Sequence, residues 1–218
     1  MNNSQHTPLV SIVVPCFQSS QWLDQLASEV KQAMVAAGFS YELILVNDCS
    51  PDDTWNTIEN ITADDDNVLG IDLVFNTGQY RSTICGLLQT RGAIIVTMDD
   101  DLQQPPRELP KLVEMLLDHH STDCVIASFD NKKHNLLRNL GTGIMDLLFR
   151  VIYKKPRGIR STSMRAMRRP LVTAISEYST INPNINPLIF QTTNRIKSIS
   201  VEHQERVAGK SGYGILRL

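Results

Sequence analysis

The chain has no run of about 18 apolar residues, so none of its 218 residues is expected to lie in a membrane-spanning helix. Its first eight residues are polar and lack the apolar core of a signal peptide. Only four cysteines are present, more than thirty residues apart and with no CxxC pair. This spacing argues against a zinc site or a disulfide framework. We therefore expect buried free thiols and a reducing, cytoplasmic setting.

Two glycine-rich phosphate-binding motifs are also missing. Neither GxxxxGK[ST] nor GxGxxG follows the first apolar run, which reads "LVSIVVPC". A P-loop and a dinucleotide-binding fingerprint are thereby excluded. Any bound diphosphate has to be neutralised by a metal ion and by basic residues from elsewhere in the chain.

Basic residues are scarce in the first part of the chain. Residues 1–130 carry five Lys and Arg against 19 Asp and Glu, a balance of −14. Residues 131–218 carry 16 basic residues against four acids, a balance of +12. Such asymmetry suggests two charged partners, a divalent cation for the acidic half and phosphate or an anionic membrane for the basic half. The alternative is two ordinary solvated faces, and no nucleic-acid partner is expected.

Short apolar runs alternate with amphipathic stretches over the first 127 residues. Buried strands are predicted at 9–16, 41–48, 68–74, 92–99 and 123–128. Helices are predicted over 22–37, from a cap at Ser50, over 79–92 and over 106–120. This alternation predicts a Rossmann-like α/β fold, with a mostly parallel sheet and helices on both faces.

The pattern changes after residue 128. An amphipathic helix is predicted at 144–153, and it would lie either at a membrane interface or on the domain core. "IRSTSMRAMRRP" predicts a strand leading into a helix, with Arg168 and Arg169 as exposed charges at the helix start. An Asn- and Pro-rich turn is expected at 182–187. We treat 1–130 and 131–218 as two halves of one domain.

Polar residues follow the ends of several predicted strands. They are Pro15-Cys16, Asn47-Asp48, Asn76 and Asp99-Asp100-Asp101. In parallel α/β sheets, ligands bind beyond the carboxyl ends of the strands. These residues therefore predict one site at this edge of the sheet.

Three consecutive acids form the most distinctive part of this set. If the segment is extended, Asp99 and Asp101 point to one side and Asp100 to the other, toward solvent, a loop or a ribose. Two carboxylates on one side favour Mg²⁺ or Mn²⁺, and Gln103 is a further candidate ligand. Because Mg²⁺ usually binds substrate phosphates as well, a diphosphate ligand is implied. The acids at 64–66 are expected to form a solvated turn.

Several stretches together resemble family-2 glycosyltransferases with the A-type nucleotide-sugar fold. They are "VSIVVPCFQSSQWL", "ELILVNDCSPDDT", "NTGQYRSTICGL", "GAIIVTMDDDLQQPPRELPKL", "SMRAMRRP" and "HQERVAGKSGY". The resemblance covers nearly the whole chain. It points to the branch that glycosylates polyprenyl phosphates, such as dolichol-phosphate mannose synthases and undecaprenyl-phosphate sugar transferases.

The resemblance implies site residues on both halves of the chain. The implied metal ligands are Asp99, Asp101 and Gln103, and the implied catalytic residues are Asp101 and Arg206. The implied donor-binding residues are Pro15, Cys16, Asp48, Gln79, Arg81, Asp99, Asp100, Lys210 and Ser211. Residues 1–130 would thus bind the donor, and residues 131–218 would face the acceptor.

The implied reaction is inverting transfer of a sugar from a UDP, GDP or dTDP sugar to polyprenyl phosphate or a related envelope glycan. A phosphate acceptor is already an oxyanion and needs no general base, only positive charge such as Arg138, Arg160 and Arg165. Many relatives carry an Asp shortly before the Arg of "SMRAMRR", and "GIRSTSMR" has none. This departure favours a phosphate acceptor over a hydroxyl that needs a base.

Two other functions were weighed. A metal-dependent sugar nucleotidyltransferase should have a glycine-rich basic loop after the first strand, and "PCFQSSQW" lacks one. A non-catalytic scaffold of the same fold should have lost its metal acids, and Asp99 and Asp101 are present. The resemblance also implies the cytoplasmic face of the inner membrane, with membrane helices after the "GKSGY" segment. The sequence is also compatible with a homo-oligomer.

Overall fold

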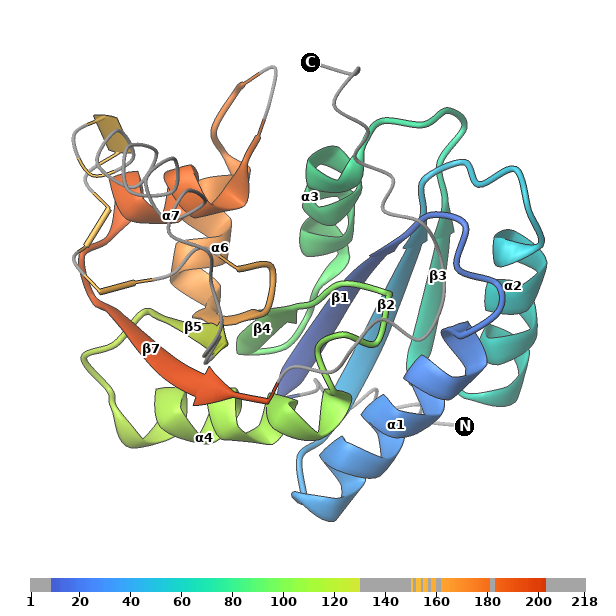
Figure 1. Cartoon of the computed structure of the whole chain (residues 1–218), viewed down its shortest axis with the longest axis horizontal. Helices are drawn as coiled ribbons and strands as arrows, with labels where there is room; N and C mark the ends of the chain where they lie inside the picture. Colours follow the sequence, from blue (N-terminus) through green and yellow to red (C-terminus); the bar gives the residue numbers. More distant parts are fainter. Residues whose placement is uncertain are drawn as a thin grey trace, which may run out of the picture.

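The computed structural model describes residues 9–129, 150, 152–153, 155–156, 158–159, 162–180 and 183–202. Seven strands in this part of the chain form one sheet, in the order β3-β2-β1-β4-β6-β5-β7 (Figure 1). Their bounds are β1 Val10–Cys16, β2 Tyr41–Asn47, β3 Val68–Asp72, β4 Ile94–Thr97, β5 Cys124–Phe129, β6 Arg165–Arg168 and β7 Ile196–Val201.

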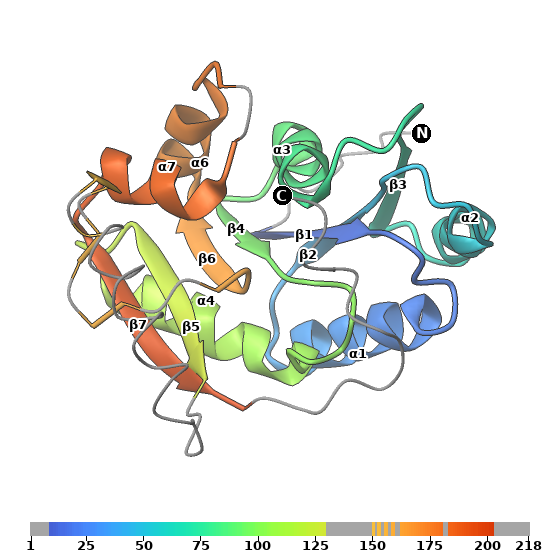
Figure 2. The same ribbon diagram turned by 45° about the horizontal axis from the view of Figure 1, so that its top comes forward.

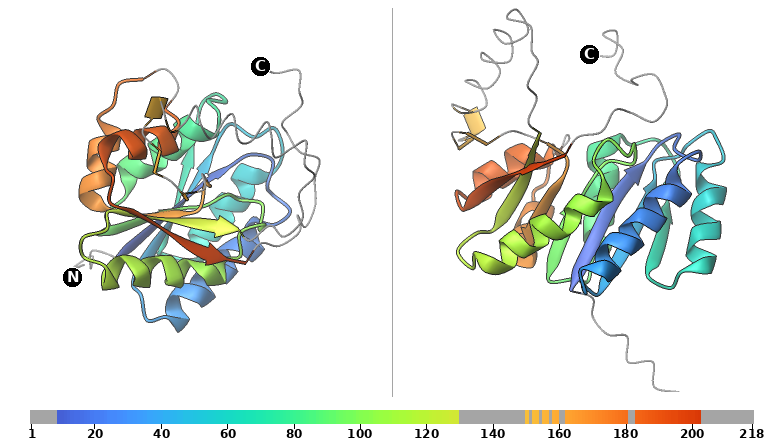
Figure 3. Two further views of the ribbon diagram at one scale, coloured as in Figure 1. Left: turned by 60° about the vertical axis from the view of Figure 1, so that its left-hand side comes forward. Right: turned by 60° about the horizontal axis from the view of Figure 1, so that its bottom comes forward.

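The sheet is parallel except at one strand. Strands β1 to β4 pair in parallel, whereas β6 runs antiparallel between β4 and β5. Strand β7 pairs in parallel with β5, and the two arrows point the same way in Figure 3. The predicted α/β fold with a mostly parallel sheet is confirmed, and one sheet contains strands from both sides of residue 130.

Helices cover both faces of the sheet, as predicted. Figure 2 shows α1 and α4 on one face and α3, α6 and α7 on the other. The helix bounds are α1 Leu23–Ala36, α2 Thr54–Asp64, α3 Gln79–Gln89, the short 3₁₀ helix η1 Pro106–Glu108, α4 Leu109–Asp118, α6 Arg169–Ser176 and α7 Ile185–Thr192. Each layer buries its own apolar core against the sheet.

Strand β1 shows how alternation divides the two cores. Val14 and Cys16 lie in the core under α1 and α4, and Val13 lies in the core under α3. Successive side chains of a strand point to opposite faces, so Pro15 and Cys16 cannot share a face. The thiol of Cys16 is fully buried, and this burial raises its pKa well above the ordinary value.

Gly86 allows α3 to approach the centre of the sheet. A β-carbon at this position would overlap the Val13 side chain and lie 3.0 Å from Val46 Cγ2. Only a residue without a side chain permits this separation. The carboxyl-terminal half of α3 therefore packs closely against β1 and β2.

Two strand predictions need correction. Residues 68–74 were predicted as a buried strand, but β3 is the edge strand and its residues are half-buried or exposed. An edge strand has only one neighbour, so apolar content alone does not show burial. Strand β4 ends at Thr97 and not at residue 99, and the chain bends from residue 100 onward.

Two helix predictions also need correction. Helix α2 begins at Thr54, and Ser50 is not its cap, because the Asp52 carboxylate accepts the Thr54 amide hydrogen bond at 3.3 Å. Half of the expected turn at 182–187 is the first part of α7. The predicted helix at 144–153 falls almost entirely outside the described residues. Within the described ranges, no helix is long and apolar enough to cross a bilayer.

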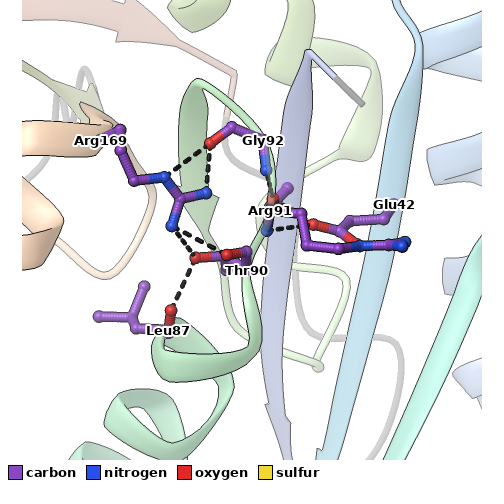
Figure 4. Close-up of polar contacts among 7 residues, drawn as sticks. Glu42, Leu87, Thr90, Arg91, Gly92 and Arg169 are labelled. Carbon is purple, nitrogen blue, oxygen red and sulfur yellow. Dashed lines mark hydrogen bonds and ion pairs between the residues drawn. The ribbon is translucent and has the colours of Figure 1, made fainter. Parts of the chain in front are cut away.

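Arg168 and Arg169 are not exposed charges, in contrast to the prediction. Arg168 Nε donates to Thr122 O at 2.8 Å, and its Nη2 donates to Leu116 O at the end of α4. Arg169 donates to Thr90 O at 2.9 Å and to Gly92 O, just past the end of α3 (Figure 4). Two adjacent guanidinium groups thus bind the carboxyl ends of two helices on opposite faces, where the helix dipole favours positive charge.

Glu42 organises the same region from β2. Its Oε1 accepts hydrogen bonds from Ser11 Oγ at 2.6 Å and from the Arg91 amide at 2.7 Å, and its Oε2 binds Arg91 Nε at 2.8 Å (Figure 4). Burial by itself would raise the pKa of Glu42, but the hydrogen bonds from Ser11 and Arg91 outweigh burial and lower it. The carboxylate is therefore a fully paired buried charge.

Arg169→Ala should lower the free energy of unfolding by about 2 kcal/mol, because two carbonyl groups and the Thr90 hydroxyl lose a charged donor. Urea unfolding measures this change. Arg195→Ala is the control, because Arg195 pairs with Asp123 at the surface, and it should change stability far less. Equal losses in the two variants would contradict the role given to Arg169.

Glu42→Gln should lower the free energy of unfolding at pH 7 by about 1 to 3 kcal/mol. The folded pKa of Glu42 lies below its ordinary value of 4.5, so the carboxylate stabilises the fold above that value. This stability is lost as the pH falls through the folded pKa. The difference between wild type and variant should therefore shrink as the pH is lowered from 7 through the folded pKa. Glu59→Gln, at an exposed position of α2, is the control and should change the free energy of unfolding at pH 7 far less.

Candidate functional site

The strand order reverses between β1 and β4, because the chain continues from β1 to β2 on one side and returns to β4 on the other. Ligands of open α/β sheets bind at such a switch point. A cavity of about 220 Å³ lies there. It is lined by Pro15, Gln79, Tyr80, Thr83, Thr97, Met98, Asp99, Thr162, Ser163, Arg165, Ile185 and Asn186.

Asp99 is the acid that faces this cavity. Its Oδ1 accepts a hydrogen bond from Gln79 Nε2 at 2.5 Å, and its Oδ2 accepts from Ser163 Oγ at 2.5 Å and from Gln104 Nε2 at 3.2 Å. Burial raises the pKa of Asp99, and the nearby charge of Asp101 raises it further. Hydrogen bonds from Ser163 and Gln79 act in the opposite direction. Hydrogen bonds therefore fix the orientation of the Asp99 carboxylate, and a second acid, Asp101, lies nearby.

The turn after the acids determines which glutamine side chain contacts Asp99. Leu102 has a φ of 57°, in the left-handed region that non-glycine residues rarely adopt. Beyond it, the Gln103 amide donates to Asp101 Oδ1 at 3.1 Å, while the Gln104 side chain turns to Asp99 and to Ser163 Oγ at 2.7 Å. The Gln104 side chain therefore contacts Asp99, and the role of Gln103 as a metal ligand stays a prediction.

Asp100 points away from the cavity. Its Oδ2 accepts hydrogen bonds from the Phe17 amide at 3.1 Å and from Ser19 Oγ at 2.5 Å, both in the β1–α1 loop. Burial raises the pKa of Asp100 to about 6, although these hydrogen bonds oppose the shift. The separation of Asp100 from Asp99 agrees with the prediction, but its cause is the turn, since β4 has already ended.

Asp48 lies at the end of β2 and holds the loop before α3. Its two carboxylate oxygens accept hydrogen bonds from the amides of Thr77 at 2.7 Å and Gly78 at 2.8 Å. Asn76 Nδ2 donates to the Asp48 carbonyl at 3.0 Å. Gly78 has a φ of 84°, which a side chain would strain. The acid thereby fixes the start of α3, where Gln79 contacts Asp99.

Arg81 lies two residues after Gln79 in α3 and does not line the cavity at Asp99. It borders a second cavity of about 210 Å³, together with Ile84, Ile175, Ser176, Tyr178, Thr180 and Pro183. This second cavity lies between α3 and the segment that links α6 to α7. Gln79 and Arg81, which were predicted to act together, are therefore placed on different cavities.

Arg165 belongs to the cavity and comes from the basic half. Strand pairing places it opposite Thr97, and only 5% of its surface is exposed. Its Nε donates to Thr97 Oγ1 at 3.0 Å, and its Nη1 donates to Asn186 Oδ1 at 2.9 Å. Burial lowers the pKa of Arg165, whereas Cys124 and Asp99 act in the opposite direction. A guanidinium group stays charged near neutral pH.

The other predicted residues divide into two sets. Pro15 lines the cavity, whereas the Cys16 thiol is buried in the core on the opposite face of the sheet. Arg138, Arg160, Arg206, Lys210 and Ser211 lie outside the described residues.

Several residues of the site were not predicted from the sequence, namely the cavity residues Ser163 and Asn186 and the Asp99 partner Gln104. Ser163 stands in "RSTSMR" directly before β6, and only the antiparallel pairing of β6 with β4 brings it to Asp99. Asn186 belongs to a segment that was predicted as a turn. Ser163 and Asn186 have partners 64 and 21 positions away along the chain, and Gln104, although only five residues from Asp99, contacts it through the left-handed turn at Leu102.

The donor chemistry of the site fits a hard divalent cation. Within the described ranges, no cluster of three or more His, Cys, Asp or Glu side chains is arranged for a metal. Asp99 and Asp101 would supply two carboxylates, and their mutual repulsion is one cause of the raised pKa of Asp99. A site with two carboxylates and room for phosphate oxygens and water is typical of Mg²⁺.

Solved structures show the same fold. A mannosyltransferase from Pyrobaculum calidifontis in complex with GDP-Man and Mn²⁺ aligns with a TM-score of 0.66 and 17% identity, covering 96% of this chain and 59% of that protein.

Curated relatives are closer in sequence. An undecaprenyl-phosphate 4-deoxy-4-formamido-L-arabinose transferase from Shewanella sediminis is 32% identical over 223 residues, covering 100% of this chain and 66% of the relative. A protein of the same name from Pseudomonas fluorescens is 33% identical, covering 96% of this chain and 61% of the relative. The chain thus spans less than two thirds of the length of these relatives.

The family assignment agrees with the site geometry. Residues 11–176 match the family described as Glycosyl transferase family 2, which is more than half of the chain. The matched residues include β2 and β4, whose carboxyl ends are followed by the acids, and β6, which carries Arg165. The chain therefore belongs to glycosyl transferase family 2.

Proposed function

We propose that this chain transfers a sugar from a nucleoside-diphosphate sugar to a polyprenyl phosphate of the undecaprenyl type, with inversion at the anomeric carbon. The observation that carries the proposal is the cavity at the switch point, which has Asp99 in one wall and Arg165 in another. The names of the relatives support the same donor and acceptor classes. The single cavity would then hold the reacting groups of both substrates.

The acidic edge would bind the donor diphosphate. Asp99 and Asp101 would hold Mg²⁺ or Mn²⁺, which would stabilise the negative charge that develops on the leaving diphosphate. Gln79, Ser163 and Gln104 fix the orientation of Asp99 through their hydrogen bonds. Outer partners of this kind are known to tune metal affinity.

Arg165 would bind the acceptor phosphate. Its side chain is already held by Thr97 and Asn186, so little conformational entropy is lost when an anion binds. The acceptor phosphate oxygen forms a bond to the anomeric carbon, and the bond from that carbon to the donor diphosphate breaks. The nucleoside diphosphate leaves with the electron pair. No proton has to be removed, which agrees with the absence of an acid from "GIRSTSMR".

The remaining assignments are part of the same proposal. Residues 1–130 form the donor half, in which Pro15 and Asp48 would border the nucleotide, whereas the Cys16 thiol is buried on the opposite face of the sheet and Arg81 borders the second cavity. Residues 131–218 form the acceptor half. There Arg138, Arg160, Arg206, Lys210 and Ser211 would contact phosphates. This basic half would face the cytoplasmic surface of an anionic membrane, where each Lys or Arg contributes about 1 kcal/mol.

Asp101→Ala should reduce sugar transfer by about a hundredfold or more, because one of two carboxylates at the diphosphate site is lost. Transfer to undecaprenyl phosphate is measured with UDP, GDP and dTDP sugars in the presence of Mn²⁺. Asp66→Ala is the matched control, since Asp66 is an exposed acid in the turn after α2. Circular dichroism confirms that both variants stay folded.

The wild-type chain should also gain thermal stability when Mn²⁺ is combined with the nucleoside diphosphate that it uses. If none of UDP, GDP and dTDP shifts the melting temperature with Mn²⁺ present, the proposed donor site is wrong. Full activity in Asp101→Ala would refute the metal role of this residue.

Gln104→Ala should weaken Mn²⁺ binding about tenfold, because Asp99 loses one of the side chains that orient it. Isothermal titration with Mn²⁺ and the nucleoside diphosphate measures the effect. Gln25→Ala, which removes an exposed glutamine of α1, is the control. Unchanged Mn²⁺ affinity in Gln104→Ala, with a loss in Gln103→Ala, would instead identify Gln103 as the relevant glutamine.

A further inference from the structure

Side chains from other segments hold the β1–α1 loop, in addition to the backbone hydrogen bond from the Trp22 amide to the Ser19 carbonyl. Three successive amides of this loop each donate to a side-chain oxygen from another part of the sheet edge. The Phe17 amide donates to Asp100 Oδ2 at 3.1 Å, the Gln18 amide to Ser50 Oγ at 3.1 Å and the Ser19 amide to Thr54 Oγ1 at 2.9 Å. The path of the loop therefore depends on the segments that follow β2 and β4.

This loop also contains a strained residue. Gln18 has a φ of 57°, a left-handed conformation that non-glycine residues adopt at a cost of about 1 to 3 kcal/mol. Cys49 after β2 and Leu102 after β4 have φ values of 52° and 57°. Each of these three loops thus contains a residue in a strained backbone conformation, which persists only because the surrounding structure fixes it.

Asp100 connects the β1–α1 loop directly to the acids of the site. One of its oxygens accepts both the Phe17 amide and the Ser19 hydroxyl, and the Ser19 side chain is fully buried. Its sequence neighbours Asp99 and Asp101 are the carboxylates of the diphosphate site. The loop that follows Pro15 is therefore tied to the segment that would bind the diphosphate.

We propose that Asp100 is a positioning residue for nucleoside-diphosphate binding and contacts neither the metal nor the donor. It fixes the β1–α1 loop, which follows Pro15 in the cavity wall, relative to Asp99 and Asp101. A nucleoside diphosphate must reach from the loop, at the nucleoside end, to the acids, at the phosphate end. The identity of the ligand in this inference rests on the proposed function. The claim that Asp100 holds the loop rests only on the hydrogen bonds.

The role of Asp100 requires a hydrogen-bond acceptor and not a negative charge. An asparagine side-chain oxygen has two lone pairs and can accept the same two hydrogen bonds. A metal ligand or a charge that acts on the donor would not survive this substitution. Asp100→Asn and Asp100→Ala therefore separate the two roles.

Asp100→Asn, Asp100→Ala, Ser19→Ala and Asp101→Asn would be compared in two measurements. The first is the Kd of UDP and of GDP at saturating Mn²⁺. The second is amide hydrogen exchange over residues 16–21 in the protein without ligand. Asp100→Ala should weaken nucleotide binding about tenfold and accelerate exchange in the loop, because a charged acceptor is lost.

Asp100→Asn should stay within about threefold of wild type in nucleotide affinity and should keep wild-type exchange, since an amide acceptor replaces the carboxylate. Ser19→Ala should accelerate exchange and weaken binding less than Asp100→Ala. It also replaces Asp100→Ala in the comparison if the latter does not fold. Asp101→Asn should lose nucleotide affinity without faster exchange in the loop.

Nucleotide binding in Asp100→Asn as weak as in Asp100→Ala would overturn the inference and assign Asp100 to the metal or the donor. Unchanged loop exchange in both Asp100→Ala and Ser19→Ala would also overturn it. If the wild-type protein binds neither UDP nor GDP, the proposed function is wrong for UDP sugars and GDP sugars. The exchange measurement still decides whether Asp100 holds the loop.

Discussion

The antiparallel pairing of β6 with β4 is the contact on which the rest of the site depends. It places Arg165 opposite Thr97 and carries Ser163 to the Asp99 carboxylate. Without this reversal of direction, the residues before β6 would lie at the other end of the sheet. The cavity would then have an acidic wall but no basic one. One strand pair therefore brings the two oppositely charged halves of the chain into a single site.

Part of the charge asymmetry of the sequence is explained by contacts that arginines make within the domain. Arg165, Arg168 and Arg169 are bonded to carbonyl and hydroxyl groups within the domain, and Arg195 pairs with Asp123. These arginines connect the later part of the chain to helices and loops of the earlier part. Part of the positive balance therefore stabilises the fold, and Arg165 would in addition bind an external anion.

The acids at the sheet edge divide into two groups by what they bind. Asp48 and Asp100 accept hydrogen bonds from loop amides and fix the loops around the cavity. Asp99 is held by neutral side chains and has Asp101 close by, so this pair is the one suited to a cation. Carboxylates therefore have two roles at this site. Asp48 and Asp100 accept hydrogen bonds from backbone amides and fix the loops, whereas the oxygen atoms of Asp99 are oriented by glutamine and serine side chains.

The sequence by itself determined the layered α/β fold and the edge of the sheet at which the acids gather. Hydrophobic periodicity and the residues after each strand are local properties, and they are enough for both conclusions. The tertiary structure decided which side chains meet. The left-handed turn at Leu102 selects Gln104 over Gln103, and long-range pairing brings Arg165 to the acids. The strand pairing joins residues 64 to 68 positions apart in sequence, and a positive φ is rare for leucine, so no local pattern encodes either contact.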